Sequence, residues 1–171
     1  GKKSGSLSFA APEEVGKYVF RMWEAEWTRM IGVSNQVSVQ YPAVSLQCDV
    51  SSQYIGMNKK LRVSYSNAPG YNNDWIGLFK VGGAQKDYFG GYQYLQGRTS
   101  GTLEFAAPET PGNYEFRFWT RENTAHLATS KPINIDWGPI TLVPTVQPAD
   151  AKGVVKVSVQ FSGAPGYNND W

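Results

Sequence analysis

The stretch GTLEFAAPETPGNYEFRFW, residues 101–119, has a close copy earlier in the chain, GSLSFAAPEEVGKYVFRMW, residues 5–23. The later copy begins at position 101 and the earlier one at position 5, so they lie 96 residues apart. A second pair has the same spacing, because NAPGYNNDW ends at Trp75 and GAPGYNNDW ends at Trp171. A fixed period of about one small domain indicates a chain of repeated structural units.

The repeat also predicts where the units begin and end. Residues 1–75 align without a gap on residues 97–171, whereas residues 76–96 occur only once. If the start of another molecule completed the last unit, that unit would still lack a segment matching residues 76–96, so we expect an excerpt of a longer covalent array. The expected units are the C-terminal part of a first repeat in residues 1–40, a complete second repeat in residues 41–136 and the N-terminal part of a third repeat in residues 137–171.

The alternation within NYEFRFW is typical of a β-strand. Tyr114, Phe116 and Phe118 alternate with Glu115, Arg117 and Trp119, so one set enters a core and the other faces outward. No segment has a helical period over about ten residues. The sequence predicts an all-β fold of tandem immunoglobulin-like antiparallel β-sandwich repeats of about 96 residues that form a rod. The seven strands expected in the complete unit are AVSLQCDV, KLRVSYSN, WIGLFKV, KDYFGGYQYL, GTLEFAA, NYEFRFW and LATSKPINI.

The segment PGYNNDW predicts a turn that leads into a strand. Proline and glycine make the turn, and the asparagine and aspartate side chains cap the backbone. The tryptophan that follows is expected to fill the core, as a large aromatic does in immunoglobulin-like sandwiches. The alternative is a calcium site, although one carboxylate with two amides is a weak ligand set. The residues concerned are Pro69, Gly70, Asn72, Asn73, Asp74 and Trp75.

Several motifs follow one another in an order that is similar to a known family. NNDWIGLFKVGG precedes YFGGYQYLQG, GTLEFAAPETPGNYEFRFW and ATSKPINI. This succession, within residues 60–135, resembles the SKICH-like group of immunoglobulin-fold β-sandwich domains. The resemblance implies a noncatalytic interaction or structural module. The well-known cytosolic members carry one copy ahead of a coiled coil, whereas this chain is tandem and has no heptads, which argues against a cytosolic adaptor role.

Outward-facing aromatic and arginine side chains predict an interaction surface. Arginine and tryptophan are enriched among the interface residues that contribute most to binding. The tyrosines of YFGGYQYL add more aromatic surface than one core face can take. The alternative is that each arginine stacks on its neighbouring tryptophan and only covers the sheet. The candidate residues are Arg21, Trp23, Tyr92, Tyr94, Arg117 and Trp119.

The junctions between the expected units are short and contain an aromatic residue followed closely by proline. Tyr41 and Pro42 lie at the first junction, and Trp137 and Pro139 lie at the second. Proline stiffens a linker, and an aromatic side chain can wedge between neighbouring domains. We therefore expect a rod and not a flexible string of domains.

Composition and charge limit the class of protein. Apolar residues make up 41% and charged residues 18%, with 18 glycines and 10 prolines, as in a folded, loop-rich chain. The net charge is +2 and the basic residues are scattered, which argues against nucleic-acid binding. No apolar run approaches the roughly 18 residues that span a membrane. The single cysteine, Cys48, is expected to be a buried, inert thiol on an edge strand, with an intermolecular disulfide as the alternative.

Little in the sequence supports catalysis, and no cofactor or metal is expected. His126 is the only histidine and Met30 occupies its matched position, so the units share no histidine-based triad or metal site. Glu13 and Glu14 lie in an expected solvated turn, and only the first of them recurs 96 residues later, as Glu109. The segment KVGGAQK lacks the Gly-Lys-Ser/Thr of a phosphate-binding loop and predicts a hairpin.

Two functions of different classes follow from these patterns. The first is a structural repeat protein of an extracellular filament or surface fibre, in which outward aromatics or strand complementation join copies of the chain or neighbouring repeats. The second is a noncatalytic carbohydrate- or protein-binding module, with polysaccharide as the favoured ligand. A packing surface should be covered by another protein chain, whereas a sugar platform should stay open.

Overall fold

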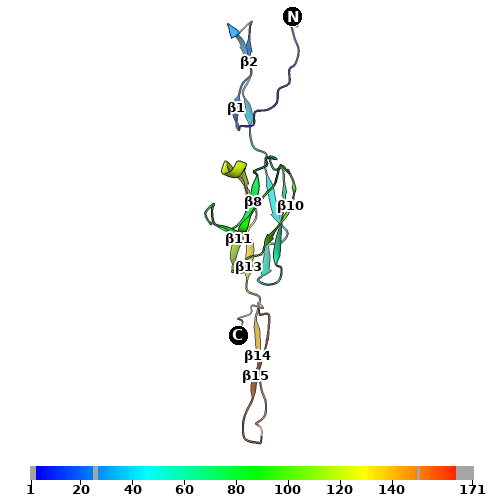
Figure 1. The fold of residues 1–171 in the computed structure, drawn as a ribbon, viewed down its shortest axis with the longest axis vertical. Coiled ribbons are helices and arrows are strands. Elements are labelled where there is room, and N and C mark those ends of the chain that lie inside the picture. Colours follow the sequence, from blue (N-terminus) through cyan, green and yellow to red (C-terminus); the bar gives the residue numbers. More distant parts are fainter. Residues whose placement is uncertain (1–2, 25–26, 150, 165–171) are drawn as a thin grey trace. The chain divides into compact units, whose positions relative to one another are not determined.

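The structure is a computed structural model that describes residues 3–24, 27–149 and 151–164. It divides into two compact units, residues 1–42 and residues 43–171 (Figure 1). Within the described residues the regular elements are β-strands, apart from the short 3₁₀ helix η2 at Arg121–Asn123 and 3₁₀ geometry at Trp27. The predicted all-β class is therefore confirmed. No helix in these ranges has the length and apolarity needed to cross a bilayer.

The first unit contains two antiparallel strand pairs. β1 (Gly16–Tyr18) pairs with β4 (Val37–Val39), and β2 (Arg21–Trp23) pairs with β3 (Met30–Val33). A β-bulge interrupts the second pair between Met22 and Trp23. The apolar side chains of β2 and β3 are exposed, whereas Tyr18 and Val39 of the other pair are half-buried.

The second unit contains a three-stranded and a six-stranded sheet. The three-stranded sheet has the order β10 (Gly101–Ala106), β7 (Lys60–Ser66), β5 (Ser45–Cys48). The six-stranded sheet has the order β6 (Ser52–Tyr54), β13 (Ile133–Asp136), β11 (Gly112–Thr120), β8 (Trp75–Lys80), β9 (Tyr88–Tyr94), and β12 (Ala125–Thr129) also pairs with β11. Among the described strand pairs of this unit, β6 and β13 alone are parallel. The unit also holds a separate hairpin of β14 (Thr141–Val146) and β15 (Val157–Ser162).

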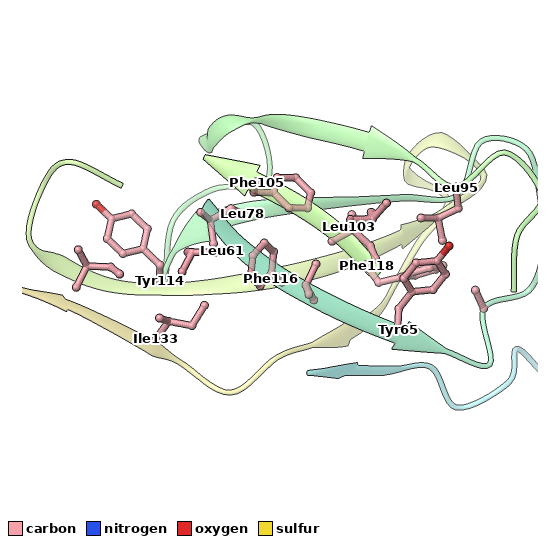
Figure 2. Close-up of a cluster of buried hydrophobic side chains, with 14 of the residues drawn as sticks. Leu61, Tyr65, Leu78, Leu95, Leu103, Phe105, Tyr114, Phe116, Phe118 and Ile133 are labelled. Atoms are coloured by element: carbon pink, nitrogen blue, oxygen red, sulfur yellow. The ribbon is translucent and has the colours of Figure 1, made fainter. Parts of the chain in front are cut away.

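The two larger sheets enclose one hydrophobic core, an arrangement that fits a β-sandwich. Alternate residues of β11, Tyr114, Phe116 and Phe118, have no exposed surface. They pack against Leu61, Phe105 and other side chains of the opposite sheet, and Figure 2 shows these rings and aliphatic chains converging between the strands. Each such side chain contributes roughly 1.5–3 kcal/mol on burial. The predicted inward set of NYEFRFW is thus confirmed.

Two details of the strands differ from the prediction. The expected single strand LATSKPINI is two strands, β12 and β13, because Pro132 has no N–H to donate. Between the two strands, the Oγ of Ser130 accepts a hydrogen bond from the Phe116 N–H at 2.9 Å. The short strand β6 was not predicted, since its sequence SQY has no apolar alternation.

Segments 96 residues apart pair in the same register. Gly16 lies opposite Val39 as Gly112 lies opposite Ile135, and Thr141 lies opposite Ser162 as Ser45 lies opposite Ser66. A tyrosine contact also recurs, because the Tyr18 hydroxyl donates to the Glu14 carbonyl at 2.8 Å and the Tyr114 hydroxyl donates to the Thr110 carbonyl at 2.9 Å. The two compact units meet between Pro42 and Ala43. The second division expected from the repeat, at Asp136, is not a boundary between these units and stays a prediction.

Candidate interaction surface

The face of the six-stranded sheet that points away from the core is covered by aromatic rings. Side chains alternate across a strand, and Ile76 and Leu78 of β8 lie in the core, so Trp75, Gly77 and Phe79 lie on the opposite face. Strand pairing sets rings of β9 and β11 beside them. We call this set the aromatic layer: Trp75, Phe79, Tyr88, Tyr92, Tyr94 and Trp119.

Trp75 is buried, with 5% of its surface exposed, but not in the core between the sheets. Its indole stacks on that of Trp119, with centroids 6.1 Å apart and 16° between the planes. Its Nε1 donates to the carbonyl of Glu122 at 3.2 Å. The expected position of this residue therefore needs correction: it lies in the outer aromatic layer, because the neighbouring aliphatic residues of β8 take the inward positions.

Asp74 fixes the turn that precedes Trp75. Its carboxylate is fully buried and accepts four hydrogen bonds. One oxygen accepts from the backbone N–H groups of Gly70 and Tyr71, at 3.1 and 2.9 Å. The other accepts from the Thr120 hydroxyl at 2.6 Å and the Arg121 N–H at 3.3 Å. The carboxylate expected to cap the turn thus also ties it to the end of β11.

The rest of the turn completes this attachment. Gly70 has φ +90°, a conformation that glycine adopts without strain. The Asn73 Nδ2 donates to a Glu122 carboxylate oxygen at 3.1 Å, and Asn72 Oδ1 lies beside the α-carbon of Gly97. Among the described residues no group of three or more histidine, cysteine, aspartate or glutamate side chains has the arrangement of a metal site.

Arg117 lies within the aromatic layer and is largely covered. Only 11% of its side chain is exposed. The guanidinium lies over the Phe79 ring at 4.6 Å, donates to Glu115 Oε1 from Nε at 2.8 Å and donates to the Gly83 carbonyl from Nη1 at 2.7 Å. Its cationic head is therefore occupied, and it stacks on phenylalanine and not on the neighbouring tryptophan.

Two glycines of β9 bring Tyr88 and Tyr92 close together on the sheet face that their even spacing gives them. Gly90 and Gly91 have φ of +70° and +98° and form a bulge, since Leu78 pairs with Phe89 while the preceding residue pairs with Tyr92. The bulge brings the rings of Tyr88 and Tyr92 to 5.3 Å, edge to face. The pair of glycines in YFGGYQYL is the sequence feature from which this β-bulge could have been predicted.

Beside these tyrosines the surface is hollowed, with a volume of about 590 Å³. The hollow combines aromatic rings with a polar rim, in which Gln85 Nε2 donates to Asn123 Oδ1 at 2.7 Å. A hydrogen bond with the side chain of Tyr92 raises the pKa of Tyr94. The lining residues are Trp75, Gln85, Lys86, Tyr88, Tyr92, Tyr94, Glu122 and Asn123. The sequence did not predict this polar rim. Its turn depends on positive φ angles at Arg121 and Glu122, and no glycine or asparagine at these positions indicates such a backbone.

At the other end of the layer Trp119 contacts His126. The ring centroids lie 4.9 Å apart, and the Trp119 Nε1 is buried without a hydrogen-bond partner in the described structure. The His126 Nε2 lies 3.0 Å from both the Ala128 carbonyl and the Thr129 hydroxyl. This histidine is thus part of β12 and has local partners.

In the first unit Arg21 and Trp23 line a larger apolar hollow of about 730 Å³. The Trp23 ring lies 5.9 Å from that of Trp27. The hollow is apolar because six large apolar side chains line it with half or more of their surface exposed, and four of them match core positions of the second unit. We call these four the first-unit apolar face: Leu7, Phe9, Phe20 and Met22.

The positions that match this face 96 residues later are buried. Leu7 is 82% exposed and Leu103 is 6% exposed, while Phe20 is 53% exposed and Phe116 is fully buried. The hairpin repeats the contrast with Phe161, which is 70% exposed where Tyr65 is 3% exposed. We call its exposed set the hairpin apolar face: Leu142, Val157, Val159 and Phe161.

The junction residues and the cysteine are described separately. Tyr41 is half-buried, and Pro42, Trp137 and Pro139 are exposed. The Trp137 N–H donates to Asp136 Oδ1 at 2.8 Å. Cys48 is half-buried at an edge of the three-stranded sheet, and burial raises the pKa of its thiol to about 11, which lowers its reactivity.

No family model and no curated protein matches the chain.

Proposed function

We propose that this chain is a noncatalytic structural protein of an extracellular filament or surface fibre, built from tandem immunoglobulin-like β-sandwich repeats. One observation carries the proposal. Apolar positions that are buried within residues 43–136 are exposed at the matched positions of both the first unit and the hairpin. Those exposed faces are surfaces that further β-structure would cover.

The size of the exposed faces supports association. Burying a leucine, valine, methionine or phenylalanine side chain contributes roughly 1.5–3 kcal/mol. The first-unit apolar face and the hairpin apolar face each hold four such residues. Contiguous exposed apolar patches of this kind are typical of protein interaction sites.

The aromatic layer supports a structural role for the second unit itself. Arg117 is enclosed by Phe79, Glu115 and the Gly83 carbonyl, so it stiffens the sheet. A rigid sheet with both faces covered is suited to carry load along a rod.

The test is the oligomeric state of two matched variants. Met22 and Met57 are both 64% exposed, but only Met22 lies on the first-unit apolar face. We expect light scattering of the unmodified chain to increase in mean mass with concentration. Met22→Asp should weaken this association about tenfold or more, because association would bury an unpaired carboxylate, and Met57→Asp should not. A chain that stays monomeric, or two variants that behave alike, would contradict the proposal.

The hollow beside Tyr92 favours a second candidate, a noncatalytic binding module for polysaccharide or protein. Tyr88, Tyr92 and Tyr94 are each about 40% exposed and stand beside amide and carboxyl groups that can hydrogen-bond a sugar. Because Trp75 also lines the hollow, soluble oligosaccharides should change tryptophan fluorescence. Tyr92→Ala should abolish that change, whereas Tyr54→Ala, at an exposed tyrosine outside the hollow, should retain it. A change that both variants retain would exclude this site.

A further inference from the structure

We propose that Tyr92 and Tyr94 of β9 form a site of oxidative modification, at which the two phenol rings are joined as a dityrosine within one chain. The co-reactants are hydrogen peroxide and a haem peroxidase, which together remove one hydrogen atom from each phenol. The inference goes beyond the proposed function, because it requires neither association of copies nor a bound saccharide.

The two rings lie on one face of β9 and touch each other. Tyr92 and Tyr94 are alternate residues of the strand, so their side chains project to the same side of the sheet. Their ring centroids are 5.3 Å apart with 83° between the planes, which is the edge-to-face contact that aromatic pairs prefer. A radical formed on either ring therefore already has a second phenol beside it.

The hydroxyl ends of the two rings lie close together. A hydrogen bond with the side chain of Tyr92 raises the pKa of Tyr94, and the only polar group of a tyrosine side chain is its hydroxyl. Dityrosine forms through the ring carbons next to the hydroxyl groups. The hydrogen bond thus places the carbons that react near each other, and rotation about the side-chain bonds can bring them into contact.

Both phenols are accessible to an oxidant. Tyr92 is 42% exposed and Tyr94 is 41% exposed. Tyr88 is a competing partner, because its ring lies at the same 5.3 Å from that of Tyr92. However, Tyr88 lies on the other side of the bulge at Gly90 and Gly91. The hydrogen bond between Tyr92 and Tyr94 favours coupling of these two.

The reaction uses no group of the protein other than the two phenols. The peroxidase, oxidised by hydrogen peroxide, takes one electron and one proton from each hydroxyl and leaves two phenoxyl radicals. The radicals form one carbon–carbon bond, and the hydrogens on the two joined carbons return to the oxygens, which restores both phenols. In total, two tyrosines and one hydrogen peroxide give one dityrosine and two water molecules.

The modification would alter the hollow on the outer face of the sheet. Tyr92 and Tyr94 both line that hollow, and the Tyr92 ring packs against the buried Trp75 at 5.2 Å. A covalent bond between the two tyrosines fixes their rings in one arrangement beside the indole. The oxidised and the unmodified chain would therefore present different surfaces at this point.

The experiment is peroxidase oxidation of the dilute unmodified chain and of four single variants. Each variant replaces tyrosine by phenylalanine, which removes the reactive hydroxyl but keeps the ring, and far-UV circular dichroism checks folding before oxidation. Tyr88→Phe is the matched control inside the cluster. Tyr54→Phe is the control outside it, because Tyr54 is 45% exposed but lies on β6, at the opposite edge of the sheet. The two test variants are Tyr92→Phe and Tyr94→Phe.

We expect dityrosine fluorescence in the unmodified chain and in both controls, and loss of most of that signal in both test variants. Trypsin cleaves after Lys86 and Arg98 and releases residues 87–98 with the three tyrosines of β9 in one peptide. After oxidation this peptide should be lighter by two hydrogen atoms. Its fragmentation should give breaks between Tyr88 and Tyr92 but none between Tyr92 and Tyr94.

Three outcomes would overturn the proposal. The first is a peptide whose fragments place the link between Tyr88 and Tyr92. The second is dityrosine that occurs only in covalent dimers on a denaturing gel, which would mean coupling between copies. The third is a chain without dityrosine under conditions in which the peroxidase couples free tyrosine.

Discussion

The indoles of Trp75 and Trp119 stack directly across two neighbouring strands, because the two residues lie opposite each other in the pairing of β8 with β11. The stack lies on the outside of the six-stranded sheet and is closed on its other side by Tyr92, whose ring centroid is 5.2 Å from that of Trp75. The second unit therefore has a second packed layer beyond its hydrophobic core, made of rings from three strands.

Removing the central ring should destabilise the second unit. We expect Trp75→Ala to lower the free energy of unfolding by about 3–5 kcal/mol, since it loses the stack on Trp119 and the hydrogen bond to the Glu122 carbonyl. Urea denaturation followed by far-UV circular dichroism measures this. The control is Trp27→Ala, at a tryptophan that is 76% exposed, which should change stability by less than about 0.5 kcal/mol. Equal effects would mean that the layer contributes nothing specific.

The buried carboxylate of Asp74 should be equally sensitive. Asp74→Ala leaves the donors of Gly70, Tyr71, Thr120 and Arg121 without their acceptor, and we expect a loss of roughly 3 kcal/mol or more in the free energy of unfolding. Asp74→Asn keeps one acceptor oxygen and should lose less. The same urea titration ranks the two variants, and an asparagine variant as unstable as the alanine variant would argue that charge and not acceptor number matters.

Gly77 should not accept even a methyl group. A Cβ built there would lie 3.1 Å from both Phe79 Cε2 and Trp75 Cζ3, so the two rings would have to move apart. We expect Gly77→Ala to cost about 1–3 kcal/mol of stability. At Gly5 no atom lies within 4 Å of an added Cβ, and Gly5→Ala is the matched control, expected to be neutral in thermal melts. A neutral Gly77→Ala would show that the layer repacks freely.

Glu104 should make stability depend on acidity. Hydrogen bonds from Lys60 and then Arg62 lower the pKa of its carboxyl group below the ordinary value. A carboxyl group whose pKa is lower in the folded state stabilises above its unfolded pKa of about 4.3, and that stabilisation is lost as the pH falls through the folded pKa. We therefore expect Glu104→Gln to be less stable than the unmodified chain near neutral pH, with the difference vanishing in acid.

Urea midpoints measured from neutral pH down to acid test this dependence. The matched variant is Glu109→Gln, at an exposed glutamate of the same unit. If Glu104→Gln and the unmodified chain kept a constant difference at every pH, the ion pairs with Lys60 and Arg62 would not be the cause.

The inward set of β11 could be predicted from the sequence because polar residues separate the aromatic ones. Tyr114, Phe116 and Phe118 alternate with Glu115 and Arg117, so the period of two identifies the buried face. The strand WIGLFK has no polar residue until its end. A run that is apolar on both faces does not indicate which face points inward. The expectation for Trp75 therefore rests on the large core aromatic of immunoglobulin-like sandwiches and not on the strand's own pattern.

The candidate site was only partly predictable for a different reason. Tyr92 and Tyr94 are predicted as interaction residues because YFGGYQYL has more aromatic residues than one core face can bury. Both line the hollow. Glu122 and Asn123 reach it only through a tight 3₁₀ turn with two residues at positive φ. Such a turn is imposed by its contacts with Asn73 and Trp75, which lie far away in the sequence, so local patterns carry no information about it.

The paired glycines of β9 have one more effect. β9 is the last strand at one side of its sheet, and a bulge at Gly90 and Gly91 breaks the even spacing of the N–H and C=O groups along that border. An uneven border cannot recruit a neighbouring molecule along its full length. The bulge therefore opposes sideways pairing of crowded copies along β9.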